Sequence, residues 1–257
     1  MHWLACGEGA LPPDDDWLAP AERDRLARQR FSKRRAEYRL RRWTAKQTVA
    51  AVLGLDAHPA RLAAVEVLNR PGGAPHVRLD GEELALEVSL TDRAGWAVCL
   101  TADPSRDPSG GLGVDLELVE PRSDAFVADF LTATERDYVR GCPAGEERDV
   151  AANLLWSAKE SALKVLQTGL RADTRSVEVH LVPGPSRPDG WAALEVRPAG
   201  RGPLPGWWRR DGAFVLTVCA PRGPAADPPA ELATAAAVLA TAVPVHSWQE
   251  RPLTGQA

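Results

Sequence analysis

The sequence predicts an α+β fold with antiparallel sheets. Three observations support this prediction: long stretches of helical composition, short segments rich in β-branched and aromatic residues, and breaks rich in proline and glycine between them. Helical and strand segments follow one another in irregular order, which is typical of α+β proteins. The 257 residues can form one large domain or two small lobes.

The first lobe begins with residues 22–53, which have helical composition and contain no proline. Residues 84–100 are rich in strand-forming residues and are followed by DPSRDPSGG, residues 103–111, which favours turns over helix and strand. We therefore expect an N-terminal lobe over residues 1–108.

The second lobe, expected over residues 109–222, repeats this mixture. A strand is predicted over 113–119 and a helix over 153–169. Further strands, separated by proline and glycine, are predicted over 176–182, 191–196 and 213–219. Proline and alanine dominate residues 223–257, so we expect this tail to be partly disordered, with a short helix within 231–240.

Composition and charge indicate a soluble cytoplasmic protein. The chain is 44% hydrophobic and 26% charged with a net charge of -4, which gives no overall electrostatic reason for nucleic-acid binding. Four scattered cysteines without C-x-x-C spacing suggest neither a zinc cluster nor a disulfide framework. The N-terminus does not resemble a secretory signal, and the apolar stretch 232–245 is shorter than the roughly 20 residues that cross a bilayer. We expect no membrane partner.

An internal repeat suggests that the two lobes are related. WTAKQTVAAVL, beginning at Trp43, aligns without gaps with WSAKESALKVL, beginning at Trp156, and five positions are identical. We therefore expect two similar lobes in a pseudo-twofold arrangement, each a small antiparallel sheet packed on a long helix. A duplicated chain would make a monomer sufficient.

Two acidic residues on the strand predicted at 113–119 are candidate metal ligands. In GVDLELV, Asp115 and Glu117 are two positions apart, so their side chains point to one face of a strand while Val114 and Leu116 point to the other. Two carboxylates on one face can bind a hard divalent cation. An isolated D-x-E pair is also typical of an ordinary solvated strand face.

A second pattern lies on the helix predicted at 153–169. In LLWSAKESALKVL, Trp156, Glu160 and Lys164 follow at successive i, i+4 spacings and form one stripe of the helix. Taken alone, this stripe also fits a surface Glu–Lys pair worth a few tenths of a kcal/mol.

Together, GVDLE and the later WSAKESALK resemble the two signature motifs of the 4'-phosphopantetheinyl transferase superfamily. The resemblance is greatest to its larger, pseudodimeric type, which serves polyketide, nonribosomal peptide and siderophore synthesis. It implies transfer of the phosphopantetheine arm of coenzyme A to a serine of an acyl or peptidyl carrier protein, with release of 3',5'-ADP.

The resemblance also implies roles for particular residues. Asp115, Glu117 and Glu160 would bind Mg²⁺ together with the pyrophosphate of coenzyme A. Lys164 and Lys159 would stabilise the charge on the leaving group. The base that accepts the serine proton would be Glu160 or a water ordered by the metal.

The resemblance extends into the first lobe. KRRAEYRLRRWTAK is similar to the family's basic helix, and Arg42 and Lys46 within it are candidate phosphate ligands. Gly73, Ala74 and Pro75 lie where the family has a G-K-P element. These residues extend the predicted coenzyme A site into the N-terminal lobe.

One position in the first lobe departs from the family pattern. SLTDRAGW, which includes Thr91 and Asp92, is similar to the family's S-L-S-H-S-x-G-W strand, but an aspartate stands at the histidine position. An ionised Asp92 facing the cofactor would repel phosphate, for which Arg93 can compensate.

Two other functions remain open from the sequence. A degenerate homologue could bind coenzyme A or a carrier protein without transfer, as Asp92 suggests. A nucleic-acid-binding protein could use the arginine-rich helix, but the acidic total and the lack of a recognition module oppose it. If a carrier protein is the partner, we expect it to dock on residues 127–140.

Overall fold

The computed structural model describes residues 1–102, 111–168, 172–184, 187–221, 227–233 and 235–245. The fold is α+β, as predicted, with mostly antiparallel sheets. The break expected at 103–111 lies almost entirely outside the described residues, so the position of the lobe boundary stays a prediction.

The N-terminal half contains a layer of helices and a layer of strands. Its helices are α1 (Pro20–Ala27), α2 (Ser32–Leu53) and α3 (Pro59–Ala63), with a short 3-10 turn η1 (Glu8–Ala10). Its strands are β1 (His2–Gly7), β2 (Val65–Asn69), β3 (Pro75–Leu79), β4 (Glu82–Glu83), β5 (Glu87–Arg93) and β6 (Trp96–Ala102).

The C-terminal half has the same kinds of layers. Its helices are α4 (Asp124–Phe130), α5 (Ala133–Gly141), α6 (Glu146–Val165) and α7 (Ala235–Ala240), with a 3-10 turn η3 (Thr174–Ser176). Its strands are β7 (Gly113–Leu118), β8 (Val177–Leu181), β9 (Ala192–Pro198), β10 (Leu204–Asp211), β11 (Phe214–Cys219) and β12 (Ala230–Glu231).

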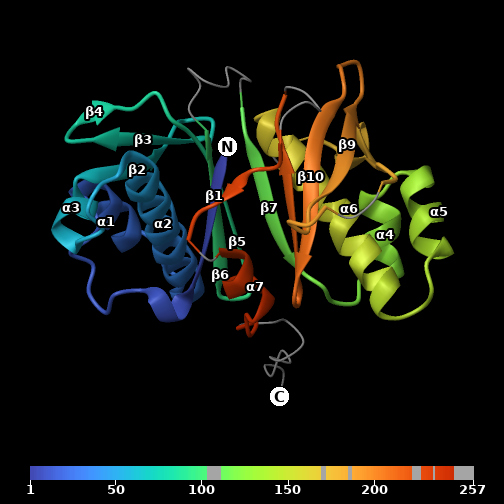
Figure 1. Ribbon diagram of the computed structural model, residues 1–257, viewed down its shortest axis with the longest axis horizontal. Coiled ribbons are helices and arrows are strands. Elements are labelled where there is room, and N and C mark those ends of the chain that lie inside the picture. The colour runs from blue at the N-terminus through green and yellow to red at the C-terminus, as the bar shows by residue number, and fades with distance from the viewer. Residues whose placement is uncertain (103–110, 169–171, 185–186, 222–226, 234, 246–257) are drawn as a thin grey trace.

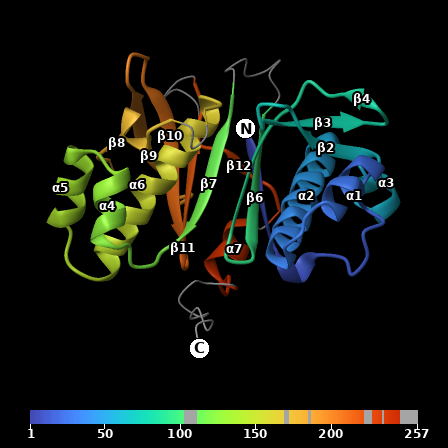
Figure 2. The same ribbon diagram turned by 180° about the vertical axis from the view of Figure 1, so that it is seen from behind.

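Two sheets lie face to face between two long helices (Figures 1 and 2). The four-stranded sheet has the order β12-β1-β6-β5, and α2 packs against β6 and β1. The five-stranded sheet has the order β7-β11-β10-β9-β8, and α6 packs against β7 and β11. The layers therefore run helix, sheet, sheet, helix. A third sheet, β2-β3-β4, lies beside α2.

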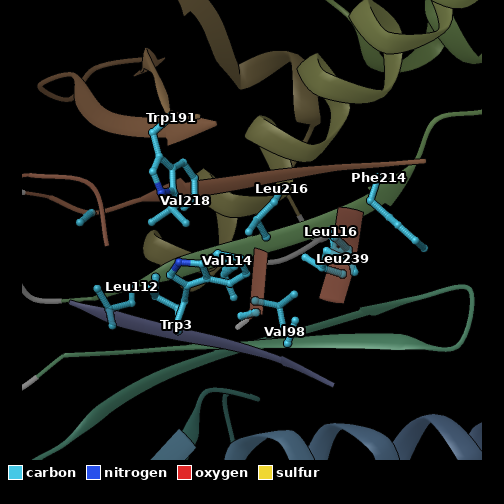
Figure 3. Close-up of a cluster of buried hydrophobic side chains, with 14 of the residues drawn as sticks. Trp3, Val98, Leu112, Val114, Leu116, Trp191, Phe214, Leu216, Val218 and Leu239 are labelled. Atoms are coloured by element: carbon cyan, nitrogen blue, oxygen red, sulfur yellow. The ribbon is translucent and has the colours of Figure 1, made fainter. Parts of the chain in front are cut away.

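The largest apolar core lies between the two sheets (Figure 3). Trp3 and Val98 of the four-stranded sheet pack here with Val114, Leu116 and Leu216 of the five-stranded sheet, all at most 1% exposed. The alternation predicted for β7 is therefore confirmed: its apolar side chains enter this core, and its acidic side chains point to the opposite face, toward α6.

Hydroxyl groups join the edges of the two sheets where β5 lies beside β7. The backbone N–H of Val114 donates to Ser89 Oγ at 3.1 Å, and that of Leu116 donates to Thr91 Oγ1 at 3.2 Å. Two side chains of β5 thus satisfy buried backbone donors of β7 that no strand of the same sheet satisfies. We call this contact the β5–β7 seam.

The structure differs from the predicted elements in several places. The helical segment 22–53 is two helices, separated at residues 28–31, where Phe31 has an extended backbone. The break lets α1 lie against α2, so that the carboxylate of Glu22 contacts Lys46 of α2. Local composition does not reveal this contact. Strands β1 and β10 were missed, β10 because its Leu204–Asp211 sequence contains proline, glycine and two arginines.

The C-terminal tail packs on the body of the molecule where it is described. The short helix expected within 231–240 is found as α7, and β12 pairs in parallel with β1. Val245 N–H donates to the carbonyl of Ala94 at 2.7 Å, and Trp96 Nε1 donates to that of Val243 at 3.0 Å. Residues 243–245 therefore contact the turn between β5 and β6.

Among the described helices, none is both long enough and apolar enough to span a lipid bilayer.

Candidate active site

The candidate site lies where α6 crosses the acidic face of β7. The two elements approach closely at Gly113, where an added Cβ would be 1.8 Å from the carbonyl oxygen of Ser161. Only glycine allows this approach. It places Glu160 and Lys164 of α6 beside Asp115 and Glu117 of β7.

Asp115 is 6% exposed and accepts two hydrogen bonds through one oxygen. Its Oδ1 accepts from Lys164 Nζ at 2.9 Å and from Thr91 Oγ1 at 3.1 Å. Lys164 also donates to the carbonyl of Val114 at 2.7 Å, which leaves one of its three protons for a ligand. The other oxygen of the aspartate, Oδ2, is buried and has no hydrogen-bond partner among the described residues.

Glu160 is a second carboxylate with a buried oxygen, Oε1, that has no hydrogen-bond partner in the part of the chain that the structure describes. Burial and the nearby Asp115 charge raise the pKa of Glu160 to about 7, against the opposing effect of Lys164. This carboxylate can therefore both accept and hold a proton near neutral pH.

Glu117 is 9% exposed, and both of its oxygens are engaged. Trp156 Nε1 donates to Oε1 at 3.0 Å, Arg122 Nη2 donates to Oε2 at 2.9 Å, and Arg93 Nε lies 3.2 Å from the same Oε2. Burial and Asp115 raise the pKa of Glu117, while the two arginines oppose the shift. The strand face is thus a buried charged site and not a solvated surface.

The donor set suits a hard divalent cation, although the three carboxylates are not arranged as a ready site. In the part of the chain that the structure describes, no group of three or more acidic, histidine or cysteine side chains is arranged to hold a metal ion. However, Asp115 Oδ2 and Glu160 Oε1 are buried acceptors to which none of the described residues donates. Such atoms are costly unless satisfied, and Mg²⁺ prefers oxygen ligands of this kind.

A cavity of about 1490 Å³ adjoins the site at Lys164. It runs from the C-terminal end of α6 along β5 to the loop between β2 and β3, and Ala74 and Pro75 line it. Its positively charged lining residues are Arg25, Arg28, Arg41, Arg42, Arg70 and Lys164. The volume exceeds that of ordinary small-ligand pockets, and the lining suits a long polyanion.

Asp92 is not a free negative charge in this site. Arg41 of α2 forms an ion pair and hydrogen bond with its Oδ1, and the Asp92 side chain is only 16% exposed. The repulsion of phosphate expected from Asp92 is therefore offset by an arginine that itself lines the cavity. The neighbouring Arg93 turns instead toward Glu117 and Glu120.

Comparisons with known proteins agree with this geometry. The family model described as the 4'-phosphopantetheinyl transferase superfamily matches residues 111–188, which include both acidic patterns. A holo-[acyl-carrier-protein] synthase from Ralstonia nicotianae (strain ATCC BAA-1114 / GMI1000) is 37% identical over 100 residues, covering 35% of this chain and 69% of that protein. The chain belongs to the 4'-phosphopantetheinyl transferase superfamily. It is a phosphopantetheinyl transferase, as the sequence motifs predicted.

The structure brings together most of the residues predicted for the site of this transferase. Asp115, Glu117, Glu160 and Lys164 form one cluster, and Thr91 contacts it through Asp115. Arg42, Ala74 and Pro75 line the adjoining cavity. Their roles toward substrate and metal stay predictions.

Lys159 is placed elsewhere, and its predicted contact with a phosphate group needs correction. Its amine is fully buried, forms an ion pair with Glu135 at 2.8 Å and donates to the carbonyls of Thr174 and Val177. Glu135 also accepts from the backbone N–H groups of Thr132 and Val179. All three amine protons are used inside the transferase, so Lys159 is a structural residue.

Lys46 is placed in the same way in the N-terminal half. It pairs with Glu22 at 2.6 Å and donates to the carbonyls of Trp17 and Leu62, and Glu22 accepts from the backbone N–H groups of Ala19 and Val67. The fully buried amine cannot reach a ligand in the cavity. The two lysines of the internal repeat thus have equivalent surroundings: a helix-capping glutamate, two carbonyls and the first strand after the long helix.

Several charged residues of the site were not predicted from the sequence. Arg122 and Glu120 follow β7 and join the network around Glu117, and Arg41 neutralises Asp92. Arg41 lay within the recognised basic stretch, but its partner is 51 residues away. No local spacing could have singled it out among the other arginines.

Proposed function

We propose that this transferase takes its phosphopantetheine group from coenzyme A and transfers it, with Mg²⁺, to a serine of an acyl or peptidyl carrier protein. The observation that supports this most is the continuity between the carboxylate cluster and the arginine-lined cavity, with Lys164 in both. A long molecule with a phosphate-rich end, bound in this cavity, would have phosphate groups next to Asp115 and Glu160.

Asp115 and Glu160 would hold the metal ion, because each has a buried oxygen free for it, and Glu117 is the further candidate ligand. When bound, Mg²⁺ supplies positive charge that polarises a phosphate and stabilises a leaving phosphate group. The ammonium group of Lys164 has one free proton and would contribute in the same direction at the mouth of the cavity.

The transfer replaces the phosphoanhydride bond of coenzyme A by a phosphate ester bond to serine. The serine oxygen bonds to the β-phosphorus of coenzyme A, the bond from that phosphorus to the bridging oxygen breaks, and 3',5'-ADP leaves with the bond electrons. The serine proton needs an acceptor, for which Glu160, whose pKa is raised to about 7, or a water ordered by the metal is the candidate. Glu160 accepts this proton only where its carboxylate is not fully used as a metal ligand, and no covalent enzyme intermediate is required.

The arginines of the cavity would bind the phosphates of coenzyme A. Arg42 stacks on the Tyr38 ring with 4.6 Å between the guanidinium carbon and the ring centroid, which fixes its direction. Ala74 and Pro75 offer apolar wall opposite the arginines. The sequence suggested from Asp92 that the protein could be a degenerate homologue that binds without transfer. The ion pair with Arg41 compensates the charge of Asp92 and so weakens the case for that alternative.

The carrier protein would dock on α4 and α5, next to the carboxylates. Phe126 and Phe130 of α4 and Trp156 form a partly exposed aromatic cluster, and Trp156 donates to Glu117. Tyr138 on α5 is 48% exposed, and Arg140 of the same helix pairs with Asp137. The aromatic side chains give apolar surface on which a carrier protein can dock.

We also propose that this is the pseudodimeric type of the family, active as a cytoplasmic monomer on carriers of polyketide or nonribosomal peptide synthesis. The matched surroundings of Lys46 and Lys159 support a duplication. Both halves would contribute to one site, since the cavity has walls from β5 and from α6.

Intact-mass analysis tests the proposal. An apo carrier protein is incubated with the transferase, coenzyme A and Mg²⁺, and we expect a mass gain of one phosphopantetheine. The gain should be lost with Asp115→Ala and without Mg²⁺. Binding of coenzyme A without mass gain on any of several diverse carriers would favour the non-catalytic alternative.

A further inference from the structure

Glu117 lies in a network of charges that is separate from the other two carboxylates. Arg93, the last residue of β5, and Arg122, which follows β7, both contact Glu117 Oε2. Both arginines also pair with Glu120, Arg93 closely and Arg122 at 3.9 Å. The Arg93 side chain is 21% exposed and that of Glu117 12%, so water screens this contact only partly.

This network leaves the three predicted metal ligands in different states. Asp115 and Glu160 each have one buried oxygen without a partner, whereas both oxygens of Glu117 already accept from protein donors. Oε2 of Glu117 contacts both arginines, so this oxygen becomes available to a cation only if at least one arginine gives up its contact.

Of the two arginines, Arg93 is held less firmly by contacts other than Glu117. Arg122 Nε donates to Asn153 Oδ1 at 2.6 Å, and its guanidinium carbon lies 4.7 Å from the centroid of the Phe126 ring. Both contacts hold Arg122 in place independently of Glu117. Arg93 has Glu120 as its other partner, to which it can remain paired after leaving Glu117.

We propose that Arg93 is a positioning residue that competes with the divalent cation for the Glu117 carboxylate. The metal-free transferase keeps Glu117 paired with Arg93, and cation binding moves Arg93 to Glu120 alone. Removing the guanidinium group therefore tightens cation binding. The inference rests on the magnesium site proposed above.

Direct binding of Mn²⁺ alone, without coenzyme A or carrier protein, tests the inference. Free Mn²⁺ is measured by electron paramagnetic resonance in titrations of the wild type, Arg93→Gln and Arg93→Lys. The matched control is Arg61→Gln, which removes the same charge from the exposed Arg61–Asp80 pair of α3. Circular dichroism and thermal unfolding of the metal-free variants establish that they are folded.

We expect Arg93→Gln to bind Mn²⁺ with a dissociation constant roughly threefold or more below that of the wild type, since loss of a partly buried ion pair frees one ligand. Arg93→Lys and Arg61→Gln should bind as the wild type does. The gain should disappear in the double variant Arg93→Gln/Glu117→Gln. Unchanged or weaker binding by a folded Arg93→Gln would overturn the inference.

Two further variants separate this failure from failure of the proposed metal site. If Asp115→Asn loses Mn²⁺ binding but Arg93→Gln does not gain it, the metal site stands and the competition by Arg93 is refuted. If Asp115→Asn and Glu160→Gln both bind as tightly as the wild type, the proposed metal site itself is refuted, and the inference with it.

Discussion

The amines of Lys46 and Lys159 each lie between a buried glutamate and two backbone carbonyls. Both lysines follow a Trp-x-Ala pattern in the sequence, the repeat from which we predicted that the two lobes are related. Burial lowers the pKa of each amine, and the glutamate partner opposes this shift. At the scale of the residue, the repeated pattern therefore encodes a structural ion pair and not a ligand contact.

Replacement of Lys159 should reduce stability more than it changes substrate binding. In Lys159→Met, Glu135 stays buried without its cation, which should cost about 3 kcal/mol or more in the free energy of unfolding. Urea unfolding measures this loss. The control is Lys33→Met, which removes a surface pair with Glu37 and should cost less than about 1 kcal/mol. A large rise in KM for coenzyme A with unchanged stability would contradict the structural role.

Cysteine reactivity should follow burial. Burial raises the pKa of Cys6 to about 11 and the pKa values of Cys99 and Cys219 to about 12. The thiolate is the reactive form, and a raised pKa keeps these thiols protonated below pH 9. At pH 8, iodoacetamide should therefore label the native protein once, at the partly exposed Cys142, and four times after denaturation. Peptide mass spectrometry identifies the sites, and rapid labelling of Cys99 would contradict the buried placement.

At the scale of the elements, Gly113 decides whether α6 can lie against β7. In Gly113→Ala, the new Cβ would overlap the Ser161 carbonyl, so α6 must move away and the acids of the two elements separate. We expect loss of several kcal/mol in stability, together with loss of transfer activity in any folded fraction. Thermal unfolding and the mass assay measure the two effects.

Gly9→Ala is the matched control for this substitution. No heavy atom lies within 4 Å of the Cβ that the substitution would add. Its melting temperature and activity should stay close to those of the wild type. Equal effects of the two substitutions would contradict the role assigned to the close approach of α6 at Gly113.

Element types were predictable where local sequence and tertiary packing agree. The acidic strand 113–119 and the helix beyond 153 were found because both combine strong local propensity with buried apolar positions. The division of 22–53 into α1 and α2 was not predictable, because it depends on the contact of Glu22 with Lys46 and with Val67 in a later strand. Strand β10 was missed because its local sequence has a poor strand propensity. Its pairing with β9 and β11, which the local sequence does not show, stabilises it.

At the scale of the whole molecule, the β5–β7 seam connects the two halves. Thr91 serves two functions there: its hydroxyl accepts from Leu116 N–H and donates to Asp115. The sequence identified the segment through its resemblance to a family motif, but the pairing of Thr91 with a strand 25 positions later is a property of the assembled fold. The same is true of the ion pair between Asp92 and Arg41.

Loss of the Thr91 hydroxyl should weaken this connection. In Thr91→Val, a buried N–H of Leu116 loses its acceptor at nearly unchanged volume, which should cost about 1–3 kcal/mol in urea unfolding. Thr48→Val is the control: its buried hydroxyl donates to a carbonyl of its own helix, and the loss should be below about 1 kcal/mol. Equal losses of stability would show that the Thr91 hydroxyl at the seam stabilises the protein no more than another buried hydroxyl group does.

The position of β1 has a consequence for how the protein forms during synthesis. β1 pairs with β6 on one side and with β12, more than 220 positions later, on the other. Until the ribosome has made residues 230–231, the outer edge of this first strand is open and can pair with another chain. Polypeptides stalled before that point should therefore aggregate more readily than the finished protein, and chaperones that recognise bare strand edges should associate with the nascent chain until late in translation.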